Sequence, residues 1–317
     1  MDKQGSGIYA WIMELVLLKT LVIVSEMGSF TDAAGKLCVT QSAVSRRIQQ
    51  LESHYGMALI DRDAEPVTPT PEGRVLLGKA RRILELQEEM DEAVTGLKVR
   101  HHIRFCCTPC FGVTRLPGIF RKLVGAYGRD LDFNVTFRLS EDIIDGLLAG
   151  RYDLAAMEHC CDLHLSSCTA YSLPPDDTVF ASAPGLGIPV GRVDLKRLAP
   201  HRLFLKAQNG CAHRFLMRGL EKMGVDGSAF GNLTYYDDLL GLVRQVCEGQ
   251  GIGFVSRELV AAEAKAGRLK IHRLKGFDHT RPRSLVVPPH FRPTETTGKF
   301  LKVFFKSFGL PLPPDLD

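Results

Sequence analysis

The sequence predicts a mixed α/β fold in three parts: a helical hairpin near the N-terminus, one long helix, and a C-terminal region of two α/β halves. Three observations lead to this prediction. Apolar residues recur at helical spacing between residues 29 and 55, a heptad pattern follows residue 71, and strand-like and helix-like segments alternate beyond residue 100. The chain has 317 residues, 45% of them hydrophobic and 24% charged, which is enough for two or three cores.

The longest apolar stretch runs from Ile8 to Val24. Glu14 and Lys19 interrupt it, so it falls short of the roughly 18 uninterrupted apolar residues of a membrane helix. It also lacks the basic start and small-residue cleavage site of a signal peptide. We therefore expect a cytoplasmic protein. The nine cysteines fit that compartment when reduced, and their odd number argues against a closed set of structural disulfides.

Net charge alone does not identify a nucleic-acid-binding protein here. The formal charge is +4, but residues 1–100 hold 12 Lys and Arg against 14 Asp and Glu, and the remaining residues hold 28 against 22. A prediction of DNA binding must therefore rest on local geometry.

The segment SFTDAAGKLCVTQSAVSRRIQQLESHY, residues 29–55, predicts two helices joined by a tight turn. Ser29 or Thr31 can cap the first helix, on which Ala33, Ala34 and Leu37 share one face. Residues 38–40 then form the turn.

The second helix begins near Gln41, and Val44, Ile48 and Leu51 recur on its inner face. Its opposite face carries side chains that can donate to base edges or phosphates: Gln41, Ser42, Ser45, Arg46 and Gln49. Such side chains on the first turns of a second helix are typical of helix-turn-helix proteins, which read the major groove there. A helical hairpin with a merely solvated face is the alternative that periodicity leaves open.

The segment SFTDAAGKLCVTQSAVSRRIQQLE resembles the helix-turn-helix of LysR-type transcriptional regulators, and the pattern SFTxAAxxLxVxQxAxSxxIxxLE is present throughout. YGMALIDRD and VTPTPEGRVLL resemble two further segments of that family, and the resemblance covers the whole chain. It implies a winged helix-turn-helix DNA-binding domain at 13–70 and a dimerisation linker helix at 71–100. It also implies a periplasmic-binding-protein-like effector domain of two α/β subdomains at 101–317, with subdomain I at about 101–178 plus 281–317 and subdomain II at about 179–280.

The resemblance also implies a set of DNA-binding residues. At the base edges and backbone these are Thr40, Gln41, Ser42, Ser45 and Arg46, with Arg62 on a phosphate beside the minor groove. The wing segment DRDAEPVTPT departs from the family, because Asp61, Asp63 and Glu65 stand where basic residues are usual, which puts wing contacts in doubt. Met13 resembles the usual start of these proteins, and we assign no function to residues 1–12.

The segment from Pro71 predicts one long helix, with Thr70 as its cap and a heptad pattern along it. The heptad positions are Leu76, Ile83, Met90 and Leu97, with Ala80, Gln87 and Val94 between them. Such a seam requires a partner helix, although packing against the helix's own domain is an alternative. LysR-type regulators dimerise through this segment, so the resemblance implies a homodimer or homotetramer on a pseudo-palindromic site in double-stranded DNA.

Beyond residue 100 the alternation of strands and helices predicts βαβ units and a parallel sheet. Strands are expected at 103–107, 132–140, 152–158, 201–207, 231–236, 252–256 and 281–289, and helices at 116–128, 141–151, 212–224, 238–251 and 296–308. The resemblance implies two halves crossed by two strands. Ligands of such sheets bind at the carboxyl ends of the strands, in the crevice between the halves.

Candidate ligand-binding residues follow the first strand and open the opposing half. They are Thr108, Pro109, Cys110 and Phe111 in TPCF, and Asn209 and Cys211 in QNGCAHR, with Ser182 as a weaker candidate. Relatives commonly carry Ser or Thr at the positions of Thr108 and Cys110, where hydroxyls hold a carboxylate or sulfate. The resemblance therefore implies a small, anionic effector.

The cysteines of this region leave an alternative open, which is a thiol-based redox-sensing regulator. Cys107, Cys110, Cys160, Cys161 and Cys211 could all converge on the crevice. Cys107 and Cys110 have CxxC spacing, but no second CxxC or His pair completes a zinc signature. We favour thiols that are inert or contact the ligand, and we expect no metal and no other cofactor.

Motifs of enzymes are missing from the sequence. GxSxG, GxxxxGK[ST] and HExxH do not occur, and GQGIG at 249–253 precedes a strand instead of following one. The pair Asp237 and Asp238 fits helix capping better than acid/base chemistry. We therefore expect no catalytic residues and no enzyme, with a solute-binding or enzymatic domain carrying a helical appendage as the remaining alternative.

Overall fold

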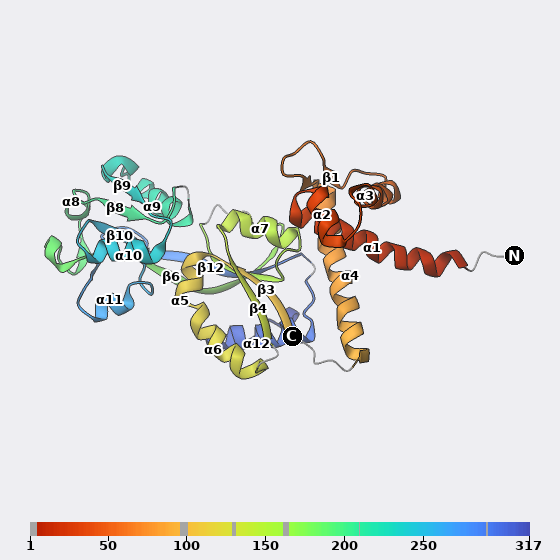
Figure 1. Ribbon diagram of the computed structural model, residues 1–317. Helices are drawn as coiled ribbons and strands as arrows, with labels where there is room; N and C mark the ends of the chain where they lie inside the picture. Colours follow the sequence, from red (N-terminus) through yellow and green to blue (C-terminus); the bar gives the residue numbers. More distant parts are fainter. Residues whose placement is uncertain (1–4, 96–100, 129–130, 161–164, 209, 290) are drawn as a thin grey trace. The chain divides into compact units, whose positions relative to one another are not determined.

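The computed structural model describes residues 5–95, 101–128, 131–160, 165–208, 210–289 and 291–317. They form two compact units, the first built mainly from residues up to His102 and the second from residues beyond it (Figure 1). No helix in these ranges combines the length and the apolar character that a membrane span requires.

The first unit is a winged helix-turn-helix followed by a long helix. Its elements are α1 (Gly5–Met27), α2 (Phe30–Leu37), α3 (Gln41–Tyr55), β1 (Ile60–Asp61), β2 (Thr68–Pro69) and α4 (Pro71–Thr95). The Ser29 hydroxyl caps α2 by accepting a hydrogen bond from Asp32 N. Cys38 adopts the left-handed conformation, with φ 53°, which ends α2 and turns the chain toward α3. Val44, Ile48 and Leu51 are buried, as the sequence predicted.

The wing is a short antiparallel pair in which Ile60 lies opposite Pro69. Glu52 on α3 fixes its base, because one carboxylate oxygen accepts hydrogen bonds from Leu59 N at 3.0 Å and Ile60 N at 3.4 Å. The other oxygen pairs with Arg62, which follows β1, at 2.7 Å. One α3 side chain thus couples this helix to the wing.

Helix α4 begins as predicted, with Gly73 N donating to the Thr70 hydroxyl at 2.9 Å. The predicted seam is wrong at Ala80, however. Ala80 and Leu77 are fully buried in the core of the first unit, because the N-terminal part of α4 packs against α1. The exposed apolar stripe lies farther along α4, at Ile83, Leu86, Met90 and Val94. Gln87 is exposed, and Leu97 lies outside the described residues.

The second unit contains two α/β halves. The first half holds β3 (His101–Cys107), α5 (Pro109–Thr114), α6 (Leu116–Tyr127), β4 (Leu131–Phe137), α7 (Ser140–Leu148), β5 (Leu154–Glu158) and α12 (Glu295–Ser307). The second half holds β7 (Gly191–Val193), α8 (Leu195–Leu198), β8 (Leu203–Leu205), α9 (Cys211–Lys222), β9 (Leu233–Tyr235), α10 (Leu239–Cys247), β10 (Ile252–Ser256), α11 (Ala261–Lys265) and β11 (Lys270–Leu274). Three short 3₁₀ turns lie at Pro184–Leu186, Gly227–Ala229 and Pro314–Leu316.

Two long strands cross between the halves, β6 (Thr169–Ser182) and β12 (Thr280–Val287), and they lie side by side in antiparallel register (Figure 1). The strand order is β4-β3-β5-β12-β6-β10-β8-β9, and β11 pairs with β6 and β7. Within the halves, β3 pairs with β5, and β8 with β10 and β9, in parallel, as the sequence predicted. Both halves therefore end their parallel strands near the crossing strands, where a ligand site is expected.

Each half has its own apolar core. Phe105, Phe111, Phe300 and Phe304 pack their rings together in the first half, with neighbouring ring centroids 5.5 to 6.3 Å apart. In the second half the rings of Phe180 and Phe254 pack in a tilted arrangement, with centroids 4.9 Å apart, within a cluster of buried aliphatic residues. Each half is therefore stabilised by apolar packing of its own.

Candidate nucleic-acid interface and effector cleft

The first turns of α3 form a polar, exposed face. The Thr40 hydroxyl caps the helix, accepting from Ala43 N at 3.2 Å, and lies 3.0 Å from the Ser42 hydroxyl. Gln41, Ser42 and Arg46 are exposed, and Ser45 is half-buried. The structure thus places five of the six predicted DNA-binding residues on one helix start. Thr40 also has a structural role, because its hydroxyl caps the N-terminus of α3.

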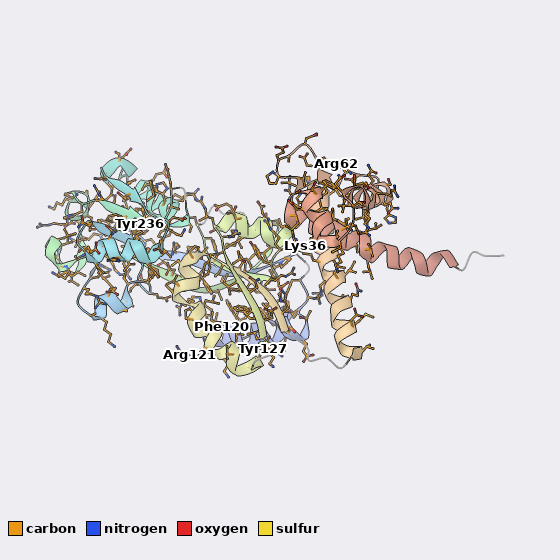
Figure 2. The ribbon with its side chains drawn as sticks, in the orientation of Figure 1. Lys36, Arg62, Phe120, Arg121, Tyr127 and Tyr236 are labelled. Atoms are coloured by element: carbon orange, nitrogen blue, oxygen red, sulfur yellow. The ribbon has the colours of Figure 1, made fainter. Side chains whose placement is uncertain are left out.

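Two neighbouring arginines of α3 differ in their surroundings. Arg47 points back toward its own domain, with Nη1 3.4 Å from the Thr20 hydroxyl on α1. Arg46 is exposed and makes no ion pair within the described ranges, so its guanidinium is available to a ligand. Arg62, the sixth predicted residue, sits at the start of the wing loop (Figure 2), where its guanidinium pairs with Glu52 and lies 5.6 Å from the Phe30 ring centroid.

A cavity of about 60 Å³ lies in the second unit between the two halves. Its apolar lining residues are Leu139, Leu239, Leu242, Phe254, Val255 and Leu259. Its polar and charged lining residues are Thr108, Cys110, Ser140, Glu158, Lys206, Cys211, Ser256 and Arg281. A lining of this composition can hold a hydrocarbon body and orient a head group.

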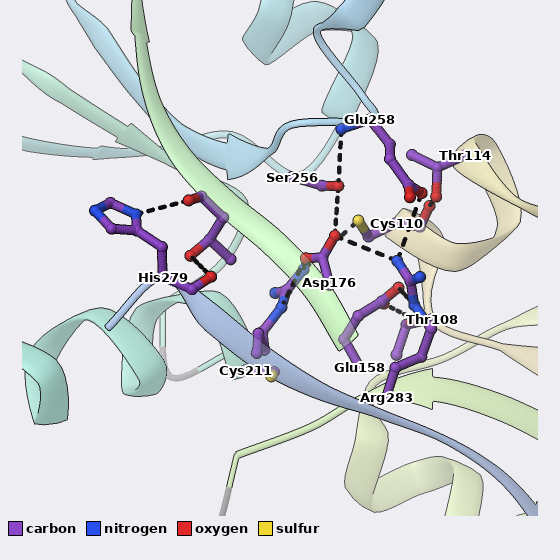
Figure 3. Close-up of polar contacts among 12 residues, drawn as sticks. Thr108, Cys110, Thr114, Glu158, Asp176, Cys211, Ser256, Glu258, His279 and Arg283 are labelled. Carbon is purple, nitrogen blue, oxygen red and sulfur yellow. Dashed lines mark hydrogen bonds and ion pairs between the residues drawn. The ribbon is translucent and has the colours of Figure 1, made fainter. Parts of the chain in front are cut away.

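Buried charged residues on the crossing strands and at the end of β5 form a cluster (Figure 3), and two of them, Glu158 and Arg281, line the cavity. On β12, Arg281 donates to Asp176 Oδ2 at 2.5 Å and 3.1 Å. Arg283, two residues on, reaches Asp176 Oδ1 at 3.2 Å and Glu158 Oε1 at 3.1 Å. All four side chains are at least 95% buried. Two cations and two anions therefore compensate one another in a site shielded from water.

Neutral donors complete this cluster. The Thr108 hydroxyl donates to Glu158 Oε2 at 2.5 Å, and the Ser256 hydroxyl donates to Asp176 Oδ1 at 2.6 Å. Burial by itself raises the pKa of Asp176, but the two guanidinium groups and the Ser256 hydroxyl outweigh it, so the pKa lies below its ordinary value. Burial acts to lower the pKa of Arg281, and Asp176 raises it well above the usual value, so Arg281 stays charged.

Four predicted ligand-binding residues line the cavity: Thr108, Pro109, Cys110 and Cys211. Thr108 has its hydroxyl engaged by Glu158, however, so its role differs from that of a free donor. The prediction that Phe111 binds the ligand is wrong. Its ring is fully buried in the aromatic core of the first half, and the cavity lining does not include it. Asn209 lies outside the described residues. The weaker candidate, Ser182, is buried and bonds His272 Nε2 at 2.8 Å.

Sequence reasoning missed Lys206, Glu158, Asp176, Arg281 and Arg283. Lys206 Nζ lies 2.8 Å from Asp237, whose side chain is 95% exposed. The other four residues could have been found in the sequence, because each is a charged residue within or at the end of a largely apolar strand. Such a position predicts a buried charge that needs a partner. Of the two aspartates predicted to cap α10, Asp238 does so by accepting from Leu240 N and Gly241 N, whereas Asp237 pairs with Lys206.

The surroundings of the Cys107 and Cys110 thiols favour their protonated form. Burial raises the pKa of Cys110 and of Cys107, and nearby Glu158 adds to both shifts. Cys160 and Cys211 lie with their Sγ atoms 3.5 Å apart, and Cys161 lies outside the described residues. Within the described ranges, no group of three or more Cys, His, Asp or Glu side chains is placed to share a metal ion.

Family models match both parts of the chain. Residues 15–74 match the model described as "Bacterial regulatory helix-turn-helix protein, lysR family", and residues 98–308 match the "LysR substrate binding domain". The helix-turn-helix and the two-halved effector-binding fold thus define a ligand-responsive transcriptional regulator. The chain belongs to the LysR family, whose members bind DNA and small-molecule effectors and form oligomers.

Individual relatives agree with this assignment. The HTH-type transcriptional regulator AbaB of Streptomyces antibioticus is 37% identical over 146 residues, 45% of this chain, and the match spans about half (48%) of AbaB. An uncharacterized HTH-type transcriptional regulator of Methanocaldococcus jannaschii, MJ0300, is 26% identical over 272 residues, covering 83% of this chain and 88% of the relative.

Solved structures share the fold. Full-length LysG from Corynebacterium glutamicum with bound effector Arg has a TM-score of 0.69 at 20% identity, covering 94% of this chain and 99% of LysG. ArgP from Mycobacterium tuberculosis has a TM-score of 0.71 at 18% identity, covering 93% and 97%. At these identities the likeness concerns the fold alone.

Proposed function

We propose that this regulator binds a pseudo-palindromic site in double-stranded DNA as a homodimer or homotetramer, in the cytoplasm, and acts by binding and not by catalysis. One observation carries the proposal: α3 buries Val44, Ile48 and Leu51 while it exposes Gln41, Ser42 and Arg46 on its first turns. An exposed polar N-terminal turn on a firmly packed helix is the geometry that enters a major groove. The acidic wing offers little to phosphates, so α3 carries most of the contact.

Oligomerisation is supported by the exposed stripe on α4. Ile83, Leu86, Met90 and Val94 expose between 43% and 87% of their surface, and they follow one another at helical spacing. A partner helix that covers the stripe removes this apolar surface from water. Two copies of α3 would then be available to read two half-sites.

We further propose that the effector is a small carboxylate with an apolar body. Asp176 neutralises Arg281, and Arg283 neutralises Glu158, so Lys206 supplies the positive charge of the cavity lining that can pair with a ligand carboxylate. The partner of Lys206, Asp237, is almost fully exposed, so water screens that pair and the ammonium can turn toward an anion. The apolar residues that line the cavity fit a hydrocarbon group.

Effector control requires that the ligand bind two arrangements of the oligomer with different affinity. Two ion pairs hold the halves together around the cavity, Arg115 with Glu258 and Arg214 with Glu141. Both pairs are accessible to water, so each contributes little and the halves can part. Opening and closing of the halves is thus the movement through which an effector acts.

DNA binding is tested with the variant Arg46→Ala in a titration against DNA from upstream of the regulator's own gene. The affinity for the specific site is expected to fall at least about fivefold, because a bidentate base contact contributes about 1–3 kcal/mol. Arg244→Ala is the matched control, since it removes another exposed arginine, from the second unit. Equal affinities of Arg46→Ala and the unsubstituted protein would exclude the assigned role of α3.

A further inference from the structure

Two thiols from opposite halves of the second unit meet beside the cavity. Cys160 follows β5 in the first half, and Cys211 is the first residue of α9 in the second half. Their Sγ atoms lie 3.5 Å apart, and the Cys160 thiol also lies 3.2 Å from the Cys211 carbonyl oxygen. Elsewhere in the cleft, Cys110 Sγ lies 3.6 Å from Arg281 Nη2.

We propose that Cys160 and Cys211 form a reversible disulfide that holds the two halves of the effector-binding domain together. A disulfide has an S–S distance of about 2.05 Å, so the two sulfur atoms must approach by roughly 1.5 Å. Rotation about the Cα–Cβ bonds supplies such an approach without movement of the sheets. The bond joins residues 51 positions apart in the chain, across the cleft.

Access and order of reaction follow from burial. Cys160 is buried, whereas Cys211 is half-buried and lines the cavity, so a small oxidant reaches Cys211 first. With hydrogen peroxide, the Cys211 sulfur attacks one peroxide oxygen, the O–O bond breaks, and a sulfenic acid and one water form. The Cys160 sulfur then attacks the sulfenic sulfur, the S–O bond breaks, and a second water leaves. Two thiols and one peroxide thus give one disulfide and two waters.

The surroundings of the pair make this reaction slow at neutral pH. The hydrogen bond with Cys160 and burial raise the pKa of Cys211, and Arg281 opposes them only in part. The thiolate is the reactive form, so the rate of disulfide formation rises with pH between 7 and 9. The disulfide therefore forms slowly and only under sustained oxidation.

The effect of the disulfide on DNA binding depends on the proposal that the effector acts by opening and closing the two halves. The Arg214–Glu141 and Arg115–Glu258 ion pairs span the same two halves but break readily in water. A covalent bond at Cys160 and Cys211 prevents the halves from parting. Oxidation is then expected to block entry of the effector and to fix one DNA-binding state.

The bond is detected by peptide mapping of the full chain. The protein is treated with hydrogen peroxide at pH 8.5, alkylated and digested with trypsin under non-reducing conditions. Cys211 is the only cysteine in the tryptic peptide 207–214, and Cys160 lies in peptide 152–192 with Cys161 and Cys168. We expect these two peptides to be linked, and dithiothreitol to separate them.

Variants identify the partner within peptide 152–192. Cys160→Ser and Cys211→Ser are each expected to abolish the link, and Cys161→Ser and Cys168→Ser to leave it intact. Absence of the link in the unsubstituted protein, or its persistence in Cys160→Ser, would overturn the proposal. Specific DNA binding is measured on the same samples. If the link forms as expected while DNA affinity and its response to carboxylates stay unchanged, the proposed effector control fails and the disulfide stands.

Discussion

Arg281 on β12 lies directly opposite Asp176 on β6, and its guanidinium donates two hydrogen bonds to one oxygen of that carboxylate. The pair sits where the strands cross between the halves. Arg283 and Glu158 extend it into an ion cluster with no net charge, of which Arg281 and Glu158 line the cavity. A ligand carboxylate therefore adds a negative charge to a neutral site. Lys206 is the lining residue whose ammonium group can pair with that charge.

The cluster predicts a strong effect of Asp176→Asn on stability. The substitution leaves two buried guanidinium groups with one carboxylate fewer, and breaking a buried pair in this way costs about 3–5 kcal/mol. Thermal unfolding of the effector-binding domain should shift clearly to lower temperature. Asp237→Asn, at a side chain that is 95% exposed, should cause almost no shift. Equal behaviour of the two variants would contradict the structural role of the cluster.

Two buried histidines predict a loss of stability in mild acid. Burial lowers the pKa of His272 and of His279 below the usual value of about 6.5. His279 donates from Nδ1 to Thr178 O and accepts at Nε2 from Leu274 N, so a second proton would place one N–H against another. Because the unfolded chain binds these protons more readily, stability is complete above about pH 6.5 and falls as the pH drops below it.

This pH dependence is measured by thermal unfolding between pH 7.5 and pH 5.5. The midpoint should decrease toward pH 5.5, and His279→Gln should start lower but change less with pH. A midpoint that is constant or rises on acidification would rule out buried neutral histidines.

The stripe on α4 predicts that Met90→Glu weakens the dimer. Met90 is 68% exposed, so the substitution does not disturb the core of the first unit but places a charge in the proposed interface. Sedimentation at micromolar concentration should show a shift toward the monomer. Val190→Glu is a matched control, because Val190 in the second unit is also 68% exposed and should leave the oligomer intact. An unchanged oligomer in Met90→Glu would place the interface elsewhere.

Lys206 predicts the selectivity of the cavity. Small monocarboxylates such as benzoate and 3-methylbutanoate are the probes, and binding is followed by calorimetry. Lys206→Met should weaken carboxylate binding at least about tenfold, because a hydrogen bond to a charged group contributes about 1.5–3 kcal/mol. Asp237→Asn keeps the ammonium and should bind at least as well. Tighter binding of the uncharged amides by the unsubstituted protein would contradict an anionic effector.

An oxidised Cys160–Cys211 pair predicts a more stable effector-binding domain. Closing a loop of this length restricts the unfolded chain, which corresponds to about 4 kcal/mol in the chain-entropy model. The midpoint of thermal unfolding should therefore rise on oxidation and return after reduction. Cys211→Ser should show neither change.

The helices of the first unit could be predicted because their signals are local. Ser29, Cys38 and Val44 fix a cap, a turn and a buried face within a few positions of one another. The heptad pattern predicted the course of α4 but not what covers each position. Ala80 packs on α1, whereas Met90, on the same predicted seam, is exposed.

The effector cavity was predicted only in part. Thr108 and Cys211 could be placed because both stand where a strand ends or a helix begins. Asp176 and Arg281 are 105 residues apart and meet only through the crossing of β6 and β12, so no local pattern pairs them. Phe111 was misplaced because its neighbours in sequence line the cavity while its own side chain turns into the core. The boundaries of the domains and subdomains stay predictions.

Recognition by α3 is tested most directly by a footprint of the purified protein on DNA upstream of its own gene, at a stated salt concentration. We expect two protected half-sites of related, inverted sequence, about 10 base pairs or a multiple of that apart, and loss of both in Arg46→Ala. Protection without sequence preference, or an identical footprint from Arg46→Ala, would contradict recognition by α3.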